Sequence, residues 1–356
     1  MARINLDHIR HAYGIRPTSP QDYALREVHH EWADGGAYAL LGPSGCGKTT
    51  LLNIISGLVR PSEGHILFDG HDVTQLPTEA RNIAQVFQFP VVYDTMTVYD
   101  NLAFPLRNRG VPEDQVASRV KNILEMLELS DRAQKKARGL TADQKQKISL
   151  GRGLVRSDVN AILFDEPLTV IDPHLKWVLR SQLKSLHRQS RFTMVYVTHD
   201  QTEALTFADK VVVMYEGQIV QIGTPEELFE KPKHTFVGYF IGSPGMNVFP
   251  ISVDGKKVRL GGEAIDLGYA PKINQGQKAE LGIRPEFMDI GKKGLPLSIR
   301  KVEDIGRQKI VRGEMAGQPV SIVVKEDKEI PSEPRVSFQD KGINIYADSW
   351  RVGREA

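Results

Sequence analysis

The sequence predicts an α/β domain that carries a helical insertion and is followed by a small all-β domain. Three observations predict this fold. An apolar run, Ala37–Leu41, meets a glycine-rich turn and then a helix, which is typical of an α/β unit. Apolar spacing becomes helical between about residues 90 and 155, and short strands with frequent turns follow residue 240. We therefore predict one domain at 1–240, with the helical subdomain at about 90–155, and a second at 241–356.

Each further element rests on its own pattern. The apolar residues of "EDQVASRVKNILEMLEL" fall on one helical face, and they are Val116, Val120, Ile123, Leu124 and Leu127. The runs "NAILFDEP" and "FTMVYVTHD" predict buried strands on either side of a helix around Leu175 to Leu186. "KVVVMYEGQIVQIG" predicts a hairpin that turns at Glu216–Gly217. After "GSPGMN", the runs "VDGKKVRLGG", "LSIRKVEDIG", "VSIVVKED" and "INIYADSW" predict the strands of a barrel-like domain.

The composition narrows the function classes. The 356 residues, 40% of them hydrophobic, suit more than one globular domain. Lys and Arg number 46 against 44 Asp and Glu, so the concentrated basic excess of nucleic-acid binders is absent and we expect no nucleic-acid partner. The single cysteine, Cys46, excludes an internal disulfide and fits a reducing cytosol. No apolar run approaches the ~18 residues that cross a bilayer, and "MARINLDHIR" lacks a signal-peptide core, so we expect any membrane role to come through partners.

The strongest chemical signal is "GPSGCGKT", which matches the phosphate-binding pattern G-x-x-x-x-G-K-[ST]. In this pattern the glycines leave backbone N–H groups accessible, and these groups bind the phosphates. Lys48 reaches the β and γ phosphates, and Thr49 offers its hydroxyl to Mg²⁺. The strand before the motif and the helix after it disfavour a coincidental glycine turn. The predicted nucleotide-binding residues are Gly42, Pro43, Ser44, Gly45, Cys46, Gly47, Lys48, Thr49 and Thr50.

Two acidic residues end the strand of "AILFDEP". Asp165 is placed to hold Mg²⁺ through water, and Glu166 to polarise an attacking water molecule. Taken alone, two acids at a strand end are as often a solvated turn. Together with the phosphate-binding loop they indicate hydrolysis of a nucleotide.

Six ordered motifs resemble those of ABC transporter ATPases across essentially the whole chain. They are Gly42 to Thr49, Gln88 in "QVFQFP", "LTADQ", Asp165 with Glu166, Asp172 in "TVIDP", and His199 in "VYVTHD". The closer resemblance is to the ATPases of carbohydrate importers such as the maltose system. It implies a P-loop ABC ATPase domain followed by a regulatory barrel of oligosaccharide-binding type, with "FIGSPGMNVFP" and "GIRPE" matching the entry to that barrel and a recurrent turn. An unrelated β domain stays open as the alternative.

By position, the resemblance assigns ATP and Mg²⁺ as cofactors and gives roles to further residues. Tyr13 in "HAYG" is implied to stack on adenine, and His199 to contact the γ-phosphate. Gln88 is implied to sense the γ-phosphate, to help hold Mg²⁺ and to line the groove facing the transmembrane subunits. Asp172 is implied to lie at the contact between ATPase subunits. A buried strand aromatic at Tyr13 and a structural histidine at His199 are the alternatives.

The signature segment departs from the family pattern. In the family, Leu-Ser-Gly-Gly-Gln of one ATPase presents a hydroxyl and bare backbone amides to the γ-phosphate held by a second. Here the segment reads Leu140, Thr141, Ala142, Asp143, Gln144. A carboxylate at Asp143 faces that phosphate, and at ~4 Å with an effective dielectric of ~20 two unit charges repel by about 4 kcal/mol. The alternative is that Asp143 caps the helix that follows.

The resemblance therefore implies an asymmetric pair of ATPases. The expected partners are a second, unlike ABC ATPase with a sound signature, two transmembrane permease subunits and, indirectly, a periplasmic or extracellular solute-binding protein. The expected location is peripheral, on the cytoplasmic face of the bacterial inner membrane. "GLTADQKQKISLGRGLVR" and "LTVIDPHLKWVLR" resemble one of the two unlike ATPases of bacterial glycerol importers, so the expected solute is glycerol. An ATP-binding regulator or scaffold with little turnover, and import of glycerol 3-phosphate or a sugar, stay open.

Overall fold

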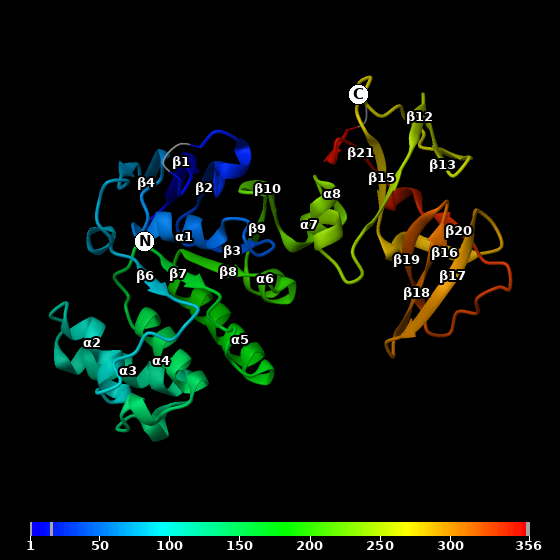
Figure 1. Ribbon diagram of the computed structural model, residues 1–356. Coiled ribbons are helices and arrows are strands. Elements are labelled where there is room, and N and C mark those ends of the chain that lie inside the picture. Colours follow the sequence, from blue (N-terminus) through cyan, green and yellow to red (C-terminus); the bar gives the residue numbers. More distant parts are fainter. Residues whose placement is uncertain (1, 15–16, 354–356) are drawn as a thin grey trace. The chain divides into compact units, whose positions relative to one another are not determined.

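The computed structural model describes residues 2–14 and 17–353 of the chain. The chain divides between Ile222 and Gly223 into two compact units (Figure 1). Across residues 2–14 and 17–353, no helix combines the length and the apolar character of a membrane span.

A ten-stranded sheet organises the first unit. Its strands, in spatial order, are β5 (His71–Asp72), β4 (Glu63–Phe68), β1 (Ile4–His11), β2 (Leu25–Trp32), β10 (Gln218–Gly223), β9 (Lys210–Tyr215), β3 (Ala37–Leu41), β8 (Met194–Thr198), β7 (Ile162–Asp165) and β6 (Ala84–Val86). The predicted strand Ala37–Leu41 and both predicted buried strands are present. The predicted hairpin joins β9 to β10 through Glu216 and Gly217, both of which have positive φ, as a tight turn of this kind requires.

The parallel part of this sheet brings distant parts of the sequence to one edge. β8 lies between β3 and β7 and pairs with both in parallel. All residues of these three strands are buried, which is typical of parallel strands covered on both faces. Since parallel strands end on the same side, the residues that follow Leu41, Phe164 and Thr198 meet at one edge of the sheet.

Six α-helices lie among the described residues of the first unit. They are α1 (Lys48–Ser56), α2 (Val98–Arg107), α3 (Glu113–Met126), α4 (Ala142–Leu154), α5 (Pro173–Ser190) and α6 (Gln201–Phe207). Helices α2, α3 and α4 gather into a subdomain near β6 (Figure 1) and lie within the segment predicted to be helical. The five apolar residues predicted on one helical face, four of them in α3 and the fifth, Leu127, its C-cap, are no more than 6% exposed. Gly151 lets α4 pack close to its neighbours, because a Cβ there would lie 2.6 Å from Leu102.

The part of the second unit that the structure describes forms three antiparallel sheets and two short α-helices. One sheet is β11 (Asn247–Pro250), β15 (Ala279–Ile283), β21 (Asn344–Ala347) and β22 (Trp350–Arg351), and another is β12 (Ser252–Asp254), β13 (Lys257–Leu260) and β14 (Glu263–Asp266). The third is β16 (Met288–Gly291), β20 (Arg335–Phe338), β17 (Leu295–Asp304), β18 (Gln308–Met315) and β19 (Gln318–Lys325), and the helices are α7 (Pro225–Glu230) and α8 (Thr235–Phe240). Buried residues of all three sheets share one hydrophobic core.

Arg284 explains why this unit begins at Gly223 in the structure, ahead of the boundary predicted at 240. Its guanidinium, 2% exposed, donates to the carbonyl oxygens of Leu228, Phe229 and Ile241. It also lies 3.9 Å above the Phe229 ring. Burial lowers the pKa of Arg284 to about 10, so the side chain stays charged at neutral pH. One arginine of the "GIRPE" turn thus ties α7 and α8 to the β sheets of the second unit.

Candidate nucleotide-binding site

The phosphate-binding loop connects β3 to α1 at the shared sheet edge. Gly42 passes so close to β9 that a Cβ there would lie 2.3 Å from the carbonyl oxygen of Met214. Gly47 has φ 98° and caps α1 without a side chain, which leaves the first N–H groups of that helix unblocked. The loop therefore offers bare amides at a helix N-terminus, the usual geometry for holding phosphate.

Lys48 lies beneath this loop. Its Nζ donates to the carbonyl oxygens of Gly42 at 2.8 Å and Pro43 at 2.9 Å, and the residue is only 6% exposed. Cys46 packs into the core, where burial raises the pKa of its thiol, so its contribution to the loop comes from its backbone. A fixed ammonium group below bare amides concentrates positive potential where an anion would lie.

Thr49 and Asp165 meet across the floor of the site. The Thr49 hydroxyl donates to Asp165 Oδ1 at 3.1 Å, from the first turn of α1 to the end of β7. Burial raises the pKa of Asp165, and the Thr49 hydrogen bond offsets part of that effect. A hydroxyl beside a carboxylate in a buried position is the oxygen donor set that suits Mg²⁺. The residues present thus fit the metal.

Glu166 is the meeting point of three side chains. Its Oε2 lies 3.0 Å from His199 Nδ1, 3.5 Å from Gln88 Nε2 and 3.4 Å from Thr169 Oγ1. Its backbone has φ 46°, a strained conformation for a residue other than glycine, and its N–H is held by the Val197 carbonyl. The side chain therefore leaves the line of β7 and points to the end of β8.

Tyr13 lies at the mouth of the site and is 68% exposed, so the interpretation as a buried strand aromatic is wrong. Its hydroxyl is 3.1 Å from Thr50 Oγ1, and its ring meets His11 edge to face with centroids 4.6 Å apart. An exposed ring fixed at both ends leaves a face free for stacking.

Most of these residues line one open cavity of about 580 Å³, whose lining does not include Gly42, Pro43, Cys46 or Asp165. Ten of the predicted residues line it: Tyr13, Ser44, Gly45, Gly47, Lys48, Thr49, Thr50, Gln88, Glu166 and His199. Ala24 and Thr169 also line it and were missed by sequence reasoning. The signal for Thr169 is its position three residues after Glu166, which places it one turn away. Nothing in the local sequence around Ala24 distinguishes it.

The signature residues Leu140 to Gln144 are not part of this cavity and lie at the start of α4. Thr141 is the N-cap: its hydroxyl accepts from the Gln144 N–H, and the Gln144 side chain accepts from the Thr141 N–H. The alternative that Asp143 caps this helix is therefore wrong, because Thr141 is the N-cap and the capping box is complete without Asp143. Asp143 lies in the first turn, and its Oδ1 is buried without a hydrogen-bond partner among the described residues.

Asp172 also caps a helix. It is the N-cap of α5, and its Oδ1 accepts from the His174 N–H at 2.9 Å. Its implied place at a subunit contact stays a prediction.

Comparison with known proteins decides the family. Residues 25–169 match the family model described as "ABC transporter", and residues 242–288 match "MalK OB fold domain". A Bordetella pertussis protein named "sn-glycerol-3-phosphate import ATP-binding protein UgpC" is 40% identical over 314 residues, which cover 87% of this chain and 86% of the relative. The chain belongs to the ABC transporter ATP-binding proteins. A protein of the same name from Ralstonia nicotianae is 37% identical over 359 residues, covering 97% of this chain and 96% of the relative.

A solved structure gives the same answer for the fold. It is titled "Structure of cbiO1 from clostridium perfringens: Part of the ABC transporter complex cbiONQ" and is 26% identical, with a TM-score of 0.57. The match covers 64% of this chain and 90% of that chain. The predicted fold is thus confirmed as a P-loop ABC ATPase domain followed by an all-β domain of the MalK OB type. The chain is an ATP-binding ATPase subunit of the carbohydrate-importer class of ABC transporters, which implies membrane permease partners.

Proposed function

We propose that this chain binds ATP with Mg²⁺ in the 580 Å³ cavity and hydrolyses it to power import of a small polyol, glycerol or its 3-phosphate. The observation that carries the proposal is the convergence of Lys48, the Thr49–Asp165 pair and the Glu166–His199 pair at one sheet edge. Bound Mg²⁺ would neutralise phosphate charge. The choice of glycerol as the solute rests on the sequence resemblance. The choice of glycerol 3-phosphate rests on the names of the relatives.

The residues divide the work as follows. Lys48 and the loop amides hold the phosphates, and Thr49 with Asp165 provides the metal ligands. Glu166 accepts a proton from the attacking water, and His199 orients Glu166 through their 3.0 Å contact. Gln88, which touches the same carboxylate, completes the γ-phosphate end, and Tyr13 stacks on adenine.

Glu166→Gln tests the motor assignment. The amide keeps the shape of the side chain and removes the base, so ATP still binds while hydrolysis falls by roughly 10²- to 10⁴-fold and transport stops. The measurement is ATP turnover and solute uptake in the reconstituted transporter, with exposed Glu125→Gln as the matched control. Full transport by Glu166→Gln would refute the assignment. Parallel uptake of labelled glycerol and labelled glycerol 3-phosphate identifies the solute.

We further propose that the chain works beside a second, unlike ATPase. Asp143 supports this, since a carboxylate in the first turn of α4 opposes phosphate in a partner's site. In a homodimer the same charge would face both nucleotides. Co-purification with the permeases tests the idea, and an active transporter containing this ATPase alone would refute it.

The permease subunits have a candidate docking surface between Gln88 and Asn101. Phe89 is 72% exposed there, and Val91 and Tyr93 are 50% and 40% exposed. An apolar surface adjoining Gln88 couples the docked helices to the γ-phosphate end of the cavity. Docking here places the chain on the cytoplasmic face of the membrane, with the solute-binding protein contacted only through the permeases.

A second candidate function is that of an ATP-binding regulator with little turnover, which the Asp143 charge also favours. The Glu166→Gln experiment separates the two. A regulator would keep supporting transport when its own hydrolysis is removed.

A further inference from the structure

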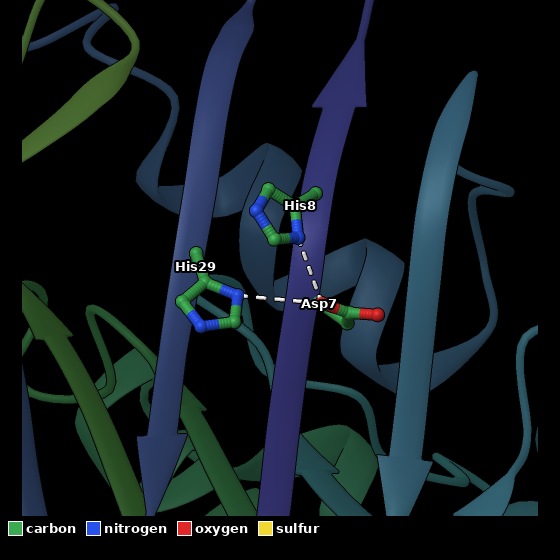
Figure 2. Close-up of side chains that lie close together, drawn as sticks. All are labelled: Asp7, His8 and His29. Atoms are coloured by element: carbon green, nitrogen blue, oxygen red, sulfur yellow. Dashed lines mark hydrogen bonds and ion pairs between the residues drawn. The ribbon is translucent and has the colours of Figure 1, made fainter.

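We propose that Asp7, His8 and His29 form a binding site for a divalent transition-metal ion such as Zn²⁺. Within residues 2–14 and 17–353, these three side chains each bring a ligand atom within 4.8 Å of the other two. Figure 2 shows both imidazole rings directed toward the Asp7 carboxylate. The site lies on β1 and β2, and the proposal is independent of the transported solute and of ATP hydrolysis.

A break in strand register creates the cluster. Successive side chains of a regular strand point to opposite faces, so Asp7 and His8 would ordinarily lie apart. The pairing of β1 shifts at this point against both β2 and β4, and His8 has φ 50°. Such a bulge changes the direction of a side chain, and the His8 ring therefore lies beside the Asp7 carboxylate. Gly64 on β4 leaves space for the shifted backbone of His8, because a Cβ at Gly64 would lie 2.3 Å from the His8 carbonyl oxygen.

The distances suit ligands of one ion. Asp7 Oδ1 lies 3.3 Å from His29 Nδ1, and it accepts a 2.8 Å hydrogen bond from His8 Nδ1 that a bound ion would replace. The two ring centroids are 4.4 Å apart. Ligands about 2.0–2.1 Å from a tetrahedral Zn²⁺ are separated by roughly 3.3 Å. The side chains of Asp7, His8 and His29 are 43%, 62% and 57% exposed, so an ion and the water that completes its shell have access.

The surroundings favour a cation of this class. His65 lies opposite Asp7 on β4, with its own Nδ1 held 2.8 Å from Asp72. Glu27 Oε1 is 3.8 Å from the second nitrogen of His8, where a carboxylate can orient a metal-bound imidazole. Two imidazoles with one carboxylate select Zn²⁺, Ni²⁺ or Cu²⁺ over Mg²⁺ or Ca²⁺.

The test is a Zn²⁺ titration of the nucleotide-free full chain, purified without a polyhistidine tag, in competition with a chromophoric chelator. We expect one ion per chain. His29→Ala and Asp7→Asn should each weaken binding by at least about tenfold, and Zn²⁺ should raise the Tm of the wild type but not of these variants. His71→Ala, which removes an exposed histidine of the same sheet outside the cluster, should leave the affinity unchanged.

Three results would overturn the proposal. They are the absence of Zn²⁺ binding to the wild type, equal affinity in His29→Ala, and loss of binding in His199→Ala but not in the cluster variants. The last result would place the ion at the nucleotide cavity. An unchanged metal-free Tm and unchanged ATP binding in each variant show that it is folded.

Discussion

The nucleotide cavity and the signature segment lie in the same unit, but only the cavity suits phosphate throughout. In the cavity, Lys48, Thr49 and Glu166 come from the ends of parallel strands and the helix that follows one of them. At the start of α4, the Thr141 hydroxyl accepts a hydrogen bond from the Gln144 N–H of its own helix, and Asp143 adds a carboxylate. One sheet edge thus gathers side chains suited to phosphate, while the start of α4 in the same unit carries a carboxylate instead.

Lys48→Ala should give the largest effect, because it removes the ammonium group held under the loop by Gly42 and Pro43. Losing a buried charge that pairs with phosphate costs about 3 kcal/mol, so ATP affinity should fall roughly a hundredfold. Titration with a fluorescent ATP analogue measures it. Lys184→Ala, whose Nζ binds the Thr206 carbonyl outside the cavity, is the control. Near-normal affinity in Lys48→Ala would mean that the cavity is not the nucleotide site.

Asp143→Gly tests the other half of the comparison. If Asp143 faces a partner's phosphate as proposed, removing the charge and the Cβ should raise ATP turnover at that site by about tenfold or more, since two negative charges ~4 Å apart would repel by ~4 kcal/mol. The assay is steady-state hydrolysis by the complete transporter in which Glu166→Gln silences this chain's own site. Asp143→Asn separates charge from bulk, because it removes the charge alone. Equal turnover in all three forms would show that Asp143 does not silence that site.

Thr141→Ala separates the structural role of the segment from its role toward a nucleotide. Loss of an N-cap threonine costs about 1 kcal/mol, and the Gln144 N–H would lose its acceptor. Chemical denaturation measures this. Thr141→Ser retains the hydroxyl and should be close to wild type. If Thr141→Ala unfolds like the wild type, the capping box does not stabilise α4.

The cavity could be predicted from sequence because its residues follow motifs at strand ends, and parallel strands end together. The cap was misassigned for a physical reason: aspartate and threonine are both good N-caps. The pattern Thr141-x-x-Gln144, a reciprocal capping box, was the better signal. Two features lay outside local sequence. The unit boundary depends on the long-range bonds of Arg284, and the Asp7–His8–His29 cluster depends on a register shift that no alternation pattern shows.

The smallest expected effect concerns Asp165, where stability and function oppose each other. Burial raises the folded-state pKa of Asp165 above its unfolded value, so the folded chain binds its proton more tightly. Folding stability from this group is therefore present at low pH and is lost as pH rises through the folded pKa. Asp165→Asn removes that cost but keeps an acceptor for Thr49, so nucleotide-free stability at pH 7 should rise by less than about 1 kcal/mol. Thermal unfolding at pH 4 and pH 7 should show the variant's advantage only at pH 7, while Mg²⁺-dependent hydrolysis is lost. An advantage of equal size at both pH values would mean that charge burial is not its cause.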